Sequence, residues 1–287
     1  MPTVSEAWQN ASKLIDRFEA KLLLASCLGV TRTYLITHDK DALTESVLNH
    51  YKKCVQERAK GVPVPYILGK QEFYGRPFKV TPAVLIPRPD TETIVEFVLA
   101  QCPIDSELSV LDMGTGSGCI AITLALENSN LNVNATDVSP AALEIAETNA
   151  KNLGADIYFY CGSWFEAIPA SLRYDIIVSN PPYIHREDEH LKNLGYEPIG
   201  ALTDGFDGLT HIDHIIKNAP SFLKKNGLLA FEHGWDQGES VRTLFKKHSL
   251  WKDIQTIQDL GGQINFIILV ITCLNQNRHI QIGHTDG

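Results

Sequence analysis

The chain has 287 residues, 44% of them hydrophobic and 21% charged, which is the composition of a globular protein with a sizeable core. Its formal net charge is −9, and because basic side chains dominate the affinity of proteins for phosphate backbones, this balance argues against a stable nucleic-acid partner. The first residues lack the apolar segment of a secretory signal, and the longest apolar run, 266–274, is too short to span a bilayer, so we expect a cytoplasmic protein without a membrane partner.

The first 70 residues predict a small bundle of helices. Apolar side chains recur at intervals of three and four within 16–28 and within 43–55. Gly61 then offers a stop, and Pro63 and Pro65 prevent the second helix from continuing. Residues 71–91 contain strand-forming side chains interrupted by Gly75-Arg76-Pro77, which predicts a β-hairpin linker after the amino-terminal domain.

Residues 92–287 alternate between strand and helix signals. Strand-like runs lie at 108–113, 131–136, 157–160, 174–179, 227–232 and 264–272. One helix between them begins at Ser139-Pro140, where the serine can cap it and the proline suits its first turn, and ends before Gly154. This alternation indicates an α/β domain in which parallel strands carry helices on both faces.

A glycine-rich loop follows the first of these strands. Gly114-Thr115-Gly116-Ser117-Gly118 separates the strand from a helix, so its backbone can turn sharply and a ligand can approach the helix amino terminus. The loop lacks G-x-G-x-x-G spacing, which excludes the dinucleotide fingerprint. The preceding Asp112 also suits an ammonium group better than a pyrophosphate.

Two further features fit an adenosine ligand without phosphates. Asp137 closes the second strand, where an acid can accept both hydroxyl groups of a ribose. Trp164 follows the third strand and can cover an adenine ring, although Trp164 and Phe165 can equally fill core space. An exposed acid beside an ordinary tight turn is the alternative interpretation of Asp137 and the glycine loop.

The most specific signal is Asn180-Pro181-Pro182-Tyr183, directly after the strand at 174–179. Ligands bind at the carboxyl edge of an open α/β sheet. Two prolines fix their own φ angles and restrict the preceding asparagine, which predicts a rigid loop that presents oxygen acceptors. A plain turn is the alternative, since Asn-Pro is common in turns.

Such a loop suits a planar NH₂ group as substrate. An amide nitrogen is a poor nucleophile because its lone pair is delocalised into the carbonyl. The side-chain oxygen of Asn180 and the main-chain oxygen of Pro181 can accept its two hydrogens, which orients the nitrogen and stabilises positive charge building on it. Tyr183 can stack on the flat group. We therefore predict catalytic roles for Asn180, Pro181 and Tyr183, and substrate binding by these residues and Pro182.

Other polar residues near these motifs allow several interpretations. Arg88 and Glu92 can contact substrate, order the hairpin or form an interdomain salt bridge. His185 lies two residues beyond the tetrapeptide, but the chemistry above needs no general base, so an exposed histidine is expected.

The six cysteines are widely scattered, and we recognise neither a C-x-x-C pair nor a histidine beside them at the spacing of a zinc motif. This pattern favours reduced thiols over a disulfide framework, and no metal site is predicted. They are Cys27, Cys54, Cys102, Cys119, Cys161 and Cys273.

These motifs resemble class I S-adenosylmethionine-dependent methyltransferases that modify planar nitrogen groups, and more closely the release factor glutamine methyltransferases. The resemblance covers most of the chain. Asn-Pro-Pro-Tyr is shared with DNA adenine methyltransferases, whereas Pro-Arg-Pro-Asp-Thr-Glu at 87–92 is much narrower. The other matching segments are Gly61-x-Pro63-x-x-Tyr66-Ile-Leu-Gly69, Glu72-Phe-Tyr-Gly75, the glycine loop, Glu197-Pro198 and Asp207-Gly208-Leu209.

The resemblance implies a Rossmann-like seven-stranded class I methyltransferase domain at 92–287, preceded by a helical-bundle domain at 1–70 that docks the substrate and by a β-hairpin linker at 71–91. It implies methyl transfer to the glutamine of the Gly-Gly-Gln motif of class 1 peptide chain release factors. The residues implied to bind S-adenosylmethionine are Gly114, Thr115, Gly116, Ser117, Gly118, Asp137, Trp164 and Asn180.

Several other functions compete with this interpretation. A sister family methylates a glutamine of a ribosomal protein but usually differs at the segment 87–92. A DNA or RNA base N-methyltransferase would share the tetrapeptide, but it must flip out a base and hold the flanking strand, which the acidic balance disfavours. A non-catalytic adenosine-binding protein would not need the tetrapeptide beside the glycine loop.

Overall fold

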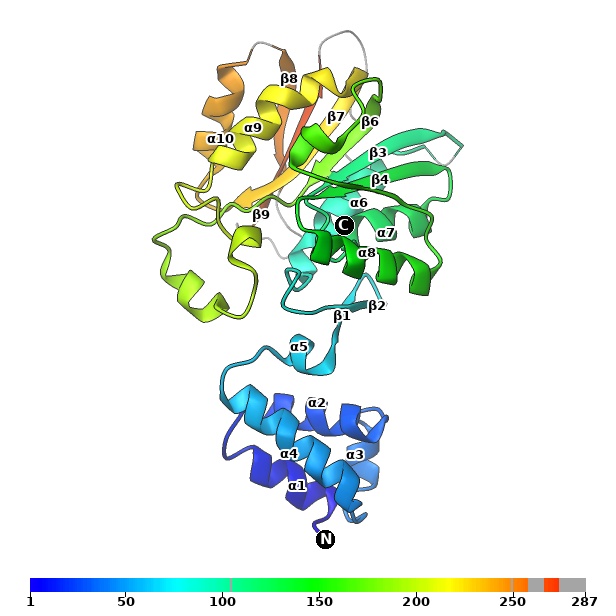
Figure 1. The fold of residues 1–287 in the computed structure, drawn as a ribbon, viewed down its shortest axis with the longest axis vertical. Helices are drawn as coiled ribbons and strands as arrows, with labels where there is room; N and C mark the ends of the chain where they lie inside the picture. Colours follow the sequence, from blue (N-terminus) through cyan, green and yellow to red (C-terminus); the bar gives the residue numbers. More distant parts are fainter. Residues whose placement is uncertain (104, 249, 258–265, 274–287) are drawn as a thin grey trace, which may run out of the picture. The chain divides into compact units, whose positions relative to one another are not determined.

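The computed structural model describes residues 1–103, 105–248, 250–257 and 266–273. The chain forms two compact units, Met1–Gln71 and Glu72–Gly287 (Figure 1). Almost all of the segment predicted as a linker, 71–91, falls in the second unit. In the part of the chain that the structure describes, the helices are too short or too polar to cross a lipid bilayer.

The first unit consists of helices around one apolar cluster, as predicted. Tyr51 donates its hydroxyl to the Ala20 oxygen at 2.9 Å, which ties the second long helix to the first. Pro63 and Pro65 do follow the end of that second helix, but a further short helix starts there, because proline is tolerated in a first helical turn. The helices are α1 (Val4–Ala11), α2 (Arg17–Leu28), α3 (Tyr34–Thr37), α4 (Glu45–Ala59) and α5 (Val64–Leu68).

A hairpin of β1 (Lys70–Phe73) and β2 (Arg76–Lys79) follows, close to where the sequence predicts one. Phe73 and Phe78 are buried and meet edge to face, with ring centroids 5.9 Å apart. Both belong to the core of the second unit, so burial of these aromatic rings holds the hairpin to that unit.

The second unit is built on a seven-stranded sheet in the order β5-β4-β3-β6-β7-β9-β8. The neighbours from β5 to β7 pair in parallel, whereas β9 is antiparallel to both β7 and β8. All strands except β8 lie close to predicted positions; residues 264 and 265 of the last prediction lie outside the described part. The strands are β3 (Leu108–Met113), β4 (Leu131–Asp137), β5 (Tyr158–Cys161), β6 (Tyr174–Ser179), β7 (Leu223–Gly234), β8 (Trp251–Ile257) and β9 (Phe266–Cys273).

Helices cover both faces of the sheet (Figure 1). Alternate residues of β3 point to opposite faces: Val110 packs with α6 (Glu92–Ala100), α7 (Cys119–Glu127) and α8 (Pro140–Leu153), whereas Leu111 packs with α9 (Thr210–Asn218) and α10 (Gly238–Lys246). The connections also contain short 3₁₀ helices at Pro89–Thr91, Trp164–Ala167, Glu189–Leu194, Ile199–Ala201 and Ala219–Ser221. This arrangement is the predicted α/β class.

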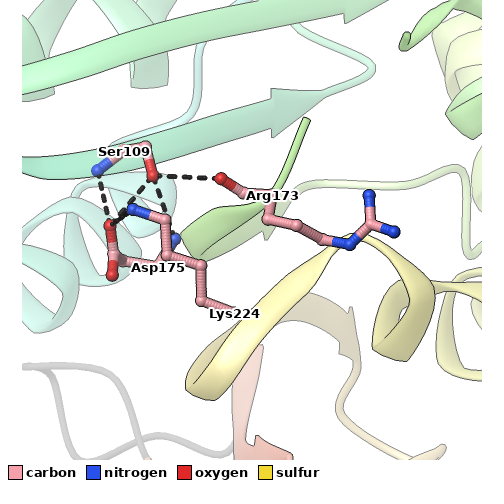
Figure 2. A network of polar contacts seen from close by, with 4 residues as sticks. All are labelled: Ser109, Arg173, Asp175 and Lys224. Atoms are coloured by element: carbon pink, nitrogen blue, oxygen red, sulfur yellow. Dashed lines mark hydrogen bonds and ion pairs between the residues drawn. The ribbon is translucent and has the colours of Figure 1, made fainter. Parts of the chain in front are cut away.

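A polar network joins three strands near their amino ends (Figure 2). One carboxylate oxygen of Asp175 accepts hydrogen bonds from the main-chain nitrogen of Ser109 at 2.8 Å and from its hydroxyl at 2.9 Å. Lys224 donates to the same oxygen at 2.7 Å. Partial burial raises the pKa of Asp175, but the bonds from Lys224 and Ser109 outweigh this effect and hold the pKa below its usual value.

Replacing Asp175 should therefore weaken the fold in a pH-dependent way. Because its pKa is lower in the folded chain, the carboxylate stabilises the protein above the unfolded pKa, and this stabilisation is lost as the pH falls through the folded pKa. Asp175→Asn should lower the free energy of unfolding by ~1 kcal/mol at pH 7, since exposure screens the ion pair. Urea unfolding should show this difference shrinking below about pH 4. Asp105→Asn, at an exposed site, is the control. An equal loss of unfolding free energy in that variant would contradict the stabilising role of the Asp175 network.

Gly118 caps the amino end of α7 with φ +81°, and a methyl group there would approach Ile122 of α7 and Ala146 of α8. The added Cβ would lie 2.7 Å from Ile122 Cδ1 and 3.3 Å from Ala146 Cβ. Gly118→Ala should lower the free energy of unfolding by ~2 kcal/mol or more, because backbone strain and overpacking add. Gly154 has φ +78°, but a Cβ added there would meet nothing within 4 Å. Gly154→Ala should therefore lower the free energy of unfolding by only ~1 kcal/mol. Equal losses in urea unfolding would show that the contacts with Ile122 and Ala146 are unimportant.

Candidate functional site

A cavity of about 360 Å³ opens in the second unit where β3, β4, β5 and β6 end. Its size is within the range of small-molecule sites. Most of the predicted ligand-binding residues form its walls. Those on the walls are Gly114, Thr115, Gly116, Ser117, Asp137, Trp164, Asn180 and Pro182. Among the described residues, Gly118, Pro181 and Tyr183 are predicted site residues that lie outside the walls.

Hydrogen bonds from β4 hold the glycine loop. The main-chain nitrogens of Gly114 and Thr115 both donate to the Thr136 oxygen at 2.9 Å, and the nitrogen of Gly116 donates to the Asp137 carboxylate at 2.9 Å. Gly114 and Gly116 have φ values of 71° and 55°, which favour glycine. The loop is therefore a backbone cradle whose shape depends on the neighbouring strand.

Asp137 lies on the cavity wall with both oxygens already in use. One oxygen accepts from Gly116 and the other from the Ser139 nitrogen, each at 2.9 Å. A carboxylate oxygen can accept more than one hydrogen bond, so Asp137 can still receive a pair of ligand hydroxyls. Burial raises the pKa of this carboxyl, while the backbone hydrogen bonds lower it.

Asp112 was expected to suit a ligand's ammonium group, but its side chain does not line the cavity. Its side chain is fully buried and outside the cavity wall. One oxygen accepts from the Thr115 hydroxyl at 2.6 Å and from the Ala121 nitrogen at 3.3 Å. Burial raises its pKa to about 7. Asp112 therefore fixes the glycine loop from behind.

Asn149 is a buried residue of α8 that the sequence analysis missed. Its side-chain nitrogen donates to the Ser117 oxygen at 2.9 Å and to the Lys79 oxygen at 3.0 Å. Its oxygen accepts from the Lys79 nitrogen at 2.7 Å. The side-chain amide of Asn149 thus joins the hairpin strand β2 to the end of the glycine loop. In the sequence, the only sign of this role is the position of Asn149 on the apolar face of a predicted helix.

Trp164 and Phe165 have different surroundings. Phe165 is buried in the core beneath α9. Trp164 lies on the cavity wall, with its ring centroid 5.1 Å from that of His211, although it also packs against the edge of this core. Trp164 has φ 46°, a strained value for a bulky residue of the kind found at functional sites.

The Asn-Pro-Pro-Tyr loop leaves the end of β6 with its asparagine on the cavity wall. The side-chain nitrogen of Asn180 donates to the Thr91 hydroxyl oxygen at 3.3 Å. This bond leaves the side-chain oxygen of Asn180 as the atom available to a ligand. Thr91, which is 3% exposed, is a second residue whose role the sequence analysis missed.

The far end of the loop is anchored through its backbone. The Tyr183 oxygen accepts from the side-chain nitrogen of Gln237 at 2.8 Å. A Cβ on Gly208 would lie 2.0 Å from the same oxygen, so the segment Asp207-Gly208-Leu209 packs against the loop backbone. The Tyr183 ring packs against the core beneath α9 and α10 and not on the cavity wall, where stacking on a substrate was expected. Its burial and the charge of Glu232 raise its pKa.

Glu232 is buried at the carboxyl end of β7, one residue beyond the Phe231 that pairs with Ser179 of β6. Neither of its carboxyl oxygens has a hydrogen-bond partner among the described residues. Burial raises its pKa to about 8, an effect that the nearby Thr91 hydroxyl reduces and the charge of Asp90 strengthens. Burial therefore disfavours the charged form of this carboxyl, which lies near the Thr91 hydroxyl that accepts from Asn180.

The remaining polar residues order the segments around the cavity. Arg88 pairs with Glu197 of the same unit, and Glu197 also accepts from the Ile86 nitrogen at 3.0 Å. Glu92 accepts from the Tyr74 nitrogen at 2.7 Å, so it orders the hairpin. His185 is exposed and outside the wall, as expected for a residue with no role as a base.

Comparisons with known proteins agree with this architecture. Residues 6–69 match the family described as PrmC N-terminal domain, and residues 104–278 match the family described as Methyltransferase domain. Solved structures with a similar fold include a methyltransferase from Pyrococcus furiosus (17% identity, TM-score 0.52, covering 70% of this chain and 90% of that one). Another is the 16S rRNA N2 G1207 methyltransferase of T. thermophilus (16% identity, TM-score 0.54, covering 71% and 50%). At this identity they show the fold alone.

Curated relatives are much more similar. The release factor glutamine methyltransferase of Bordetella pertussis is 45% identical over 250 residues, covering 86% of this chain and 92% of that protein. The protein of the same name from Bacillus subtilis is 40% identical over 286 residues, covering 94% and 99%. Because both relatives match almost from end to end, the chain belongs to the family of release factor glutamine methyltransferases.

Proposed function

We propose that this protein transfers the methyl group of S-adenosylmethionine to the side-chain nitrogen of the glutamine in the Gly-Gly-Gln motif of class 1 peptide chain release factors. The family and its curated relatives support this substrate. The observation that carries the proposal is that Asn180, with its nitrogen bonded to Thr91, lies on the same cavity wall as the glycine loop and Asp137. These residues combine an adenosine site with an acceptor for an amide NH₂ group.

The cavity residues fit S-adenosylmethionine, which supplies an electrophilic methyl group on a sulfonium when bound. Asp137 receives the ribose hydroxyls, and Trp164 covers the adenine ring. The backbone from Gly114 to Ser117 holds the methionine part, and the turn at Gly118 sets the direction of the helix that follows. The uncharged cradle and the acidic acceptor suit a cofactor without phosphates.

Asn180 and Pro181 hold the substrate amide. The Asn180 side-chain oxygen accepts one hydrogen of the glutamine nitrogen, and the Pro181 main-chain oxygen accepts the other. This grip directs the nitrogen toward the methyl group and stabilises the positive charge that builds on it. We assign Pro182 and Tyr183 to keeping this loop rigid, because Pro182 has a fixed φ and Tyr183 is anchored by Gln237.

We also propose a division of labour along the chain. Residues 1–70 dock the release factor, residues 71–91 link the two domains, and residues 92–287 catalyse the methyl transfer. Since release factors act in translation, the protein works in the cytoplasm.

The function is tested by offering tritiated S-adenosylmethionine to purified release factor, ribosomal proteins, DNA and RNA in parallel. Label should enter the release factor, and replacing the glutamine of its Gly-Gly-Gln motif by alanine should remove it. Label in ribosomal protein or nucleic acid, with none in the release factor, would refute the proposal.

Replacing Asn180 or its partner should affect the reaction more than cofactor binding. Asn180→Ala should lower kcat by ~10²-fold or more, because a charge-stabilising contact is lost. Thr91→Val should lower kcat by ~10-fold, since the Asn180 amide is then free to turn. Thr91→Ser keeps the hydroxyl and is the matched control. Calorimetry should find cofactor affinity within ~3-fold of wild type, and normal turnover of Asn180→Ala would contradict the role of Asn180 in holding the substrate amide.

A further inference from the structure

Two cysteines and a histidine meet between α2 and α4 in the first unit. The sulfur of Cys27 lies 3.9 Å from that of Cys54, and the Cys54 sulfur lies 4.0 Å from His50 Nε2. All three potential ligand atoms lie within 4.8 Å of one another. Within the described ranges of the chain, this is the one group of three or more such side chains found close enough to share a metal ion.

Helix geometry explains why these residues meet although Cys27 and Cys54 are 27 positions apart. His50 and Cys54 are one turn apart on α4 and therefore share a face. Cys27 is in the last turn of α2. The hydrogen bond from Tyr51 to Ala20 and the shared apolar cluster hold the two helices together. The grouping is thus set by rigid elements.

The spacing suits a tetrahedral ion with thiolate and imidazole ligands. Zinc takes such ligands with Zn–S near 2.3 Å, which places two coordinated sulfurs about 3.8 Å apart. The observed separation of the two sulfurs, 3.9 Å, matches this edge of the tetrahedron. A disulfide instead needs an S–S distance of about 2 Å and gives no role to the histidine.

We propose that Cys27, His50 and Cys54 form a zinc site with water as the fourth ligand. His50 is exposed, which leaves an entry path and an open position for the water, while Cys54 is buried. Binding releases the two thiol protons to solvent, and no electrons are transferred. The ion connects α2 to α4 and stabilises the first unit. The proposal departs from the sequence-based prediction of no metal site, and it is independent of the proposed methyl transfer.

The test uses the full chain, reduced and freed of metal. Cobalt should bind at one ion per chain with the visible and near-ultraviolet absorption of a tetrahedral thiolate complex, and zinc should displace it and raise Tm. Cys27→Ser and Cys54→Ser should lose this absorption. His50→Gln should weaken zinc affinity by ~10-fold or more, because losing a ligand costs at least as much as losing a hydrogen-bond partner of a ligand.

Matched controls separate a specific site from general effects. Cys161→Ser removes an exposed thiol, and His190→Gln removes an exposed histidine; both should bind zinc as the wild type does. His50→Gln changes an exposed side chain, so circular dichroism should show a folded protein even if a cysteine variant misfolds. Absence of cobalt or zinc binding in the wild type, or affinity unchanged in His50→Gln, would overturn the proposal.

Discussion

The parallel pairing of β3 with both of its neighbours is the constraint on which the site depends. Met113, the last residue of β3, pairs with Thr136 of β4 and with Ser179 of β6. The residues that directly follow these three in the chain are predicted site residues, namely Gly114, Asp137 and Asn180. Because parallel strands in register end at the same level, three segments far apart in sequence begin side by side at one edge of the sheet.

Two of these segments are held in place by residues that lie outside the cavity wall. Asp112 binds the glycine loop from the core, Asn149 joins it to the hairpin, and Gln237 anchors the backbone of Tyr183. Such contacts restrict the loops before any ligand arrives, so less conformational entropy is lost on binding. Buried acids at this edge have raised pKa values because the low-dielectric surroundings disfavour charge, and Glu232, with its pKa near 8 and close to Thr91, is an example.

Much of the fold followed from local patterns, but elements with weak signals did not. The buried strands have continuous apolar runs, and α8 has a clear serine cap, proline and closing glycine. The helical bundle predicted for residues 1–70 includes the first helix, α1, but its bounds were not predicted because it is short, although its Thr3–Glu6 capping box could have indicated where it starts. The strand β8 was missed because it is only partly buried and mixes polar with apolar residues, so its pairing with β9 decides its conformation.

Local patterns in the chain were enough to predict the fold class, the glycine loop, the acid at the end of β4 and the importance of the Asn-Pro-Pro-Tyr tetrapeptide, because glycine, proline and capping residues act on the backbone locally. The contacts of those residues depend on how distant parts of the chain pack. The hydrogen bond from Asn180 to Thr91 spans 89 positions and that between Asn149 and Lys79 spans 70. The meeting of Cys27, His50 and Cys54 likewise required two helices to pack. Such partners cannot be predicted from their spacing along the chain, because the packing of helices and strands brings them together.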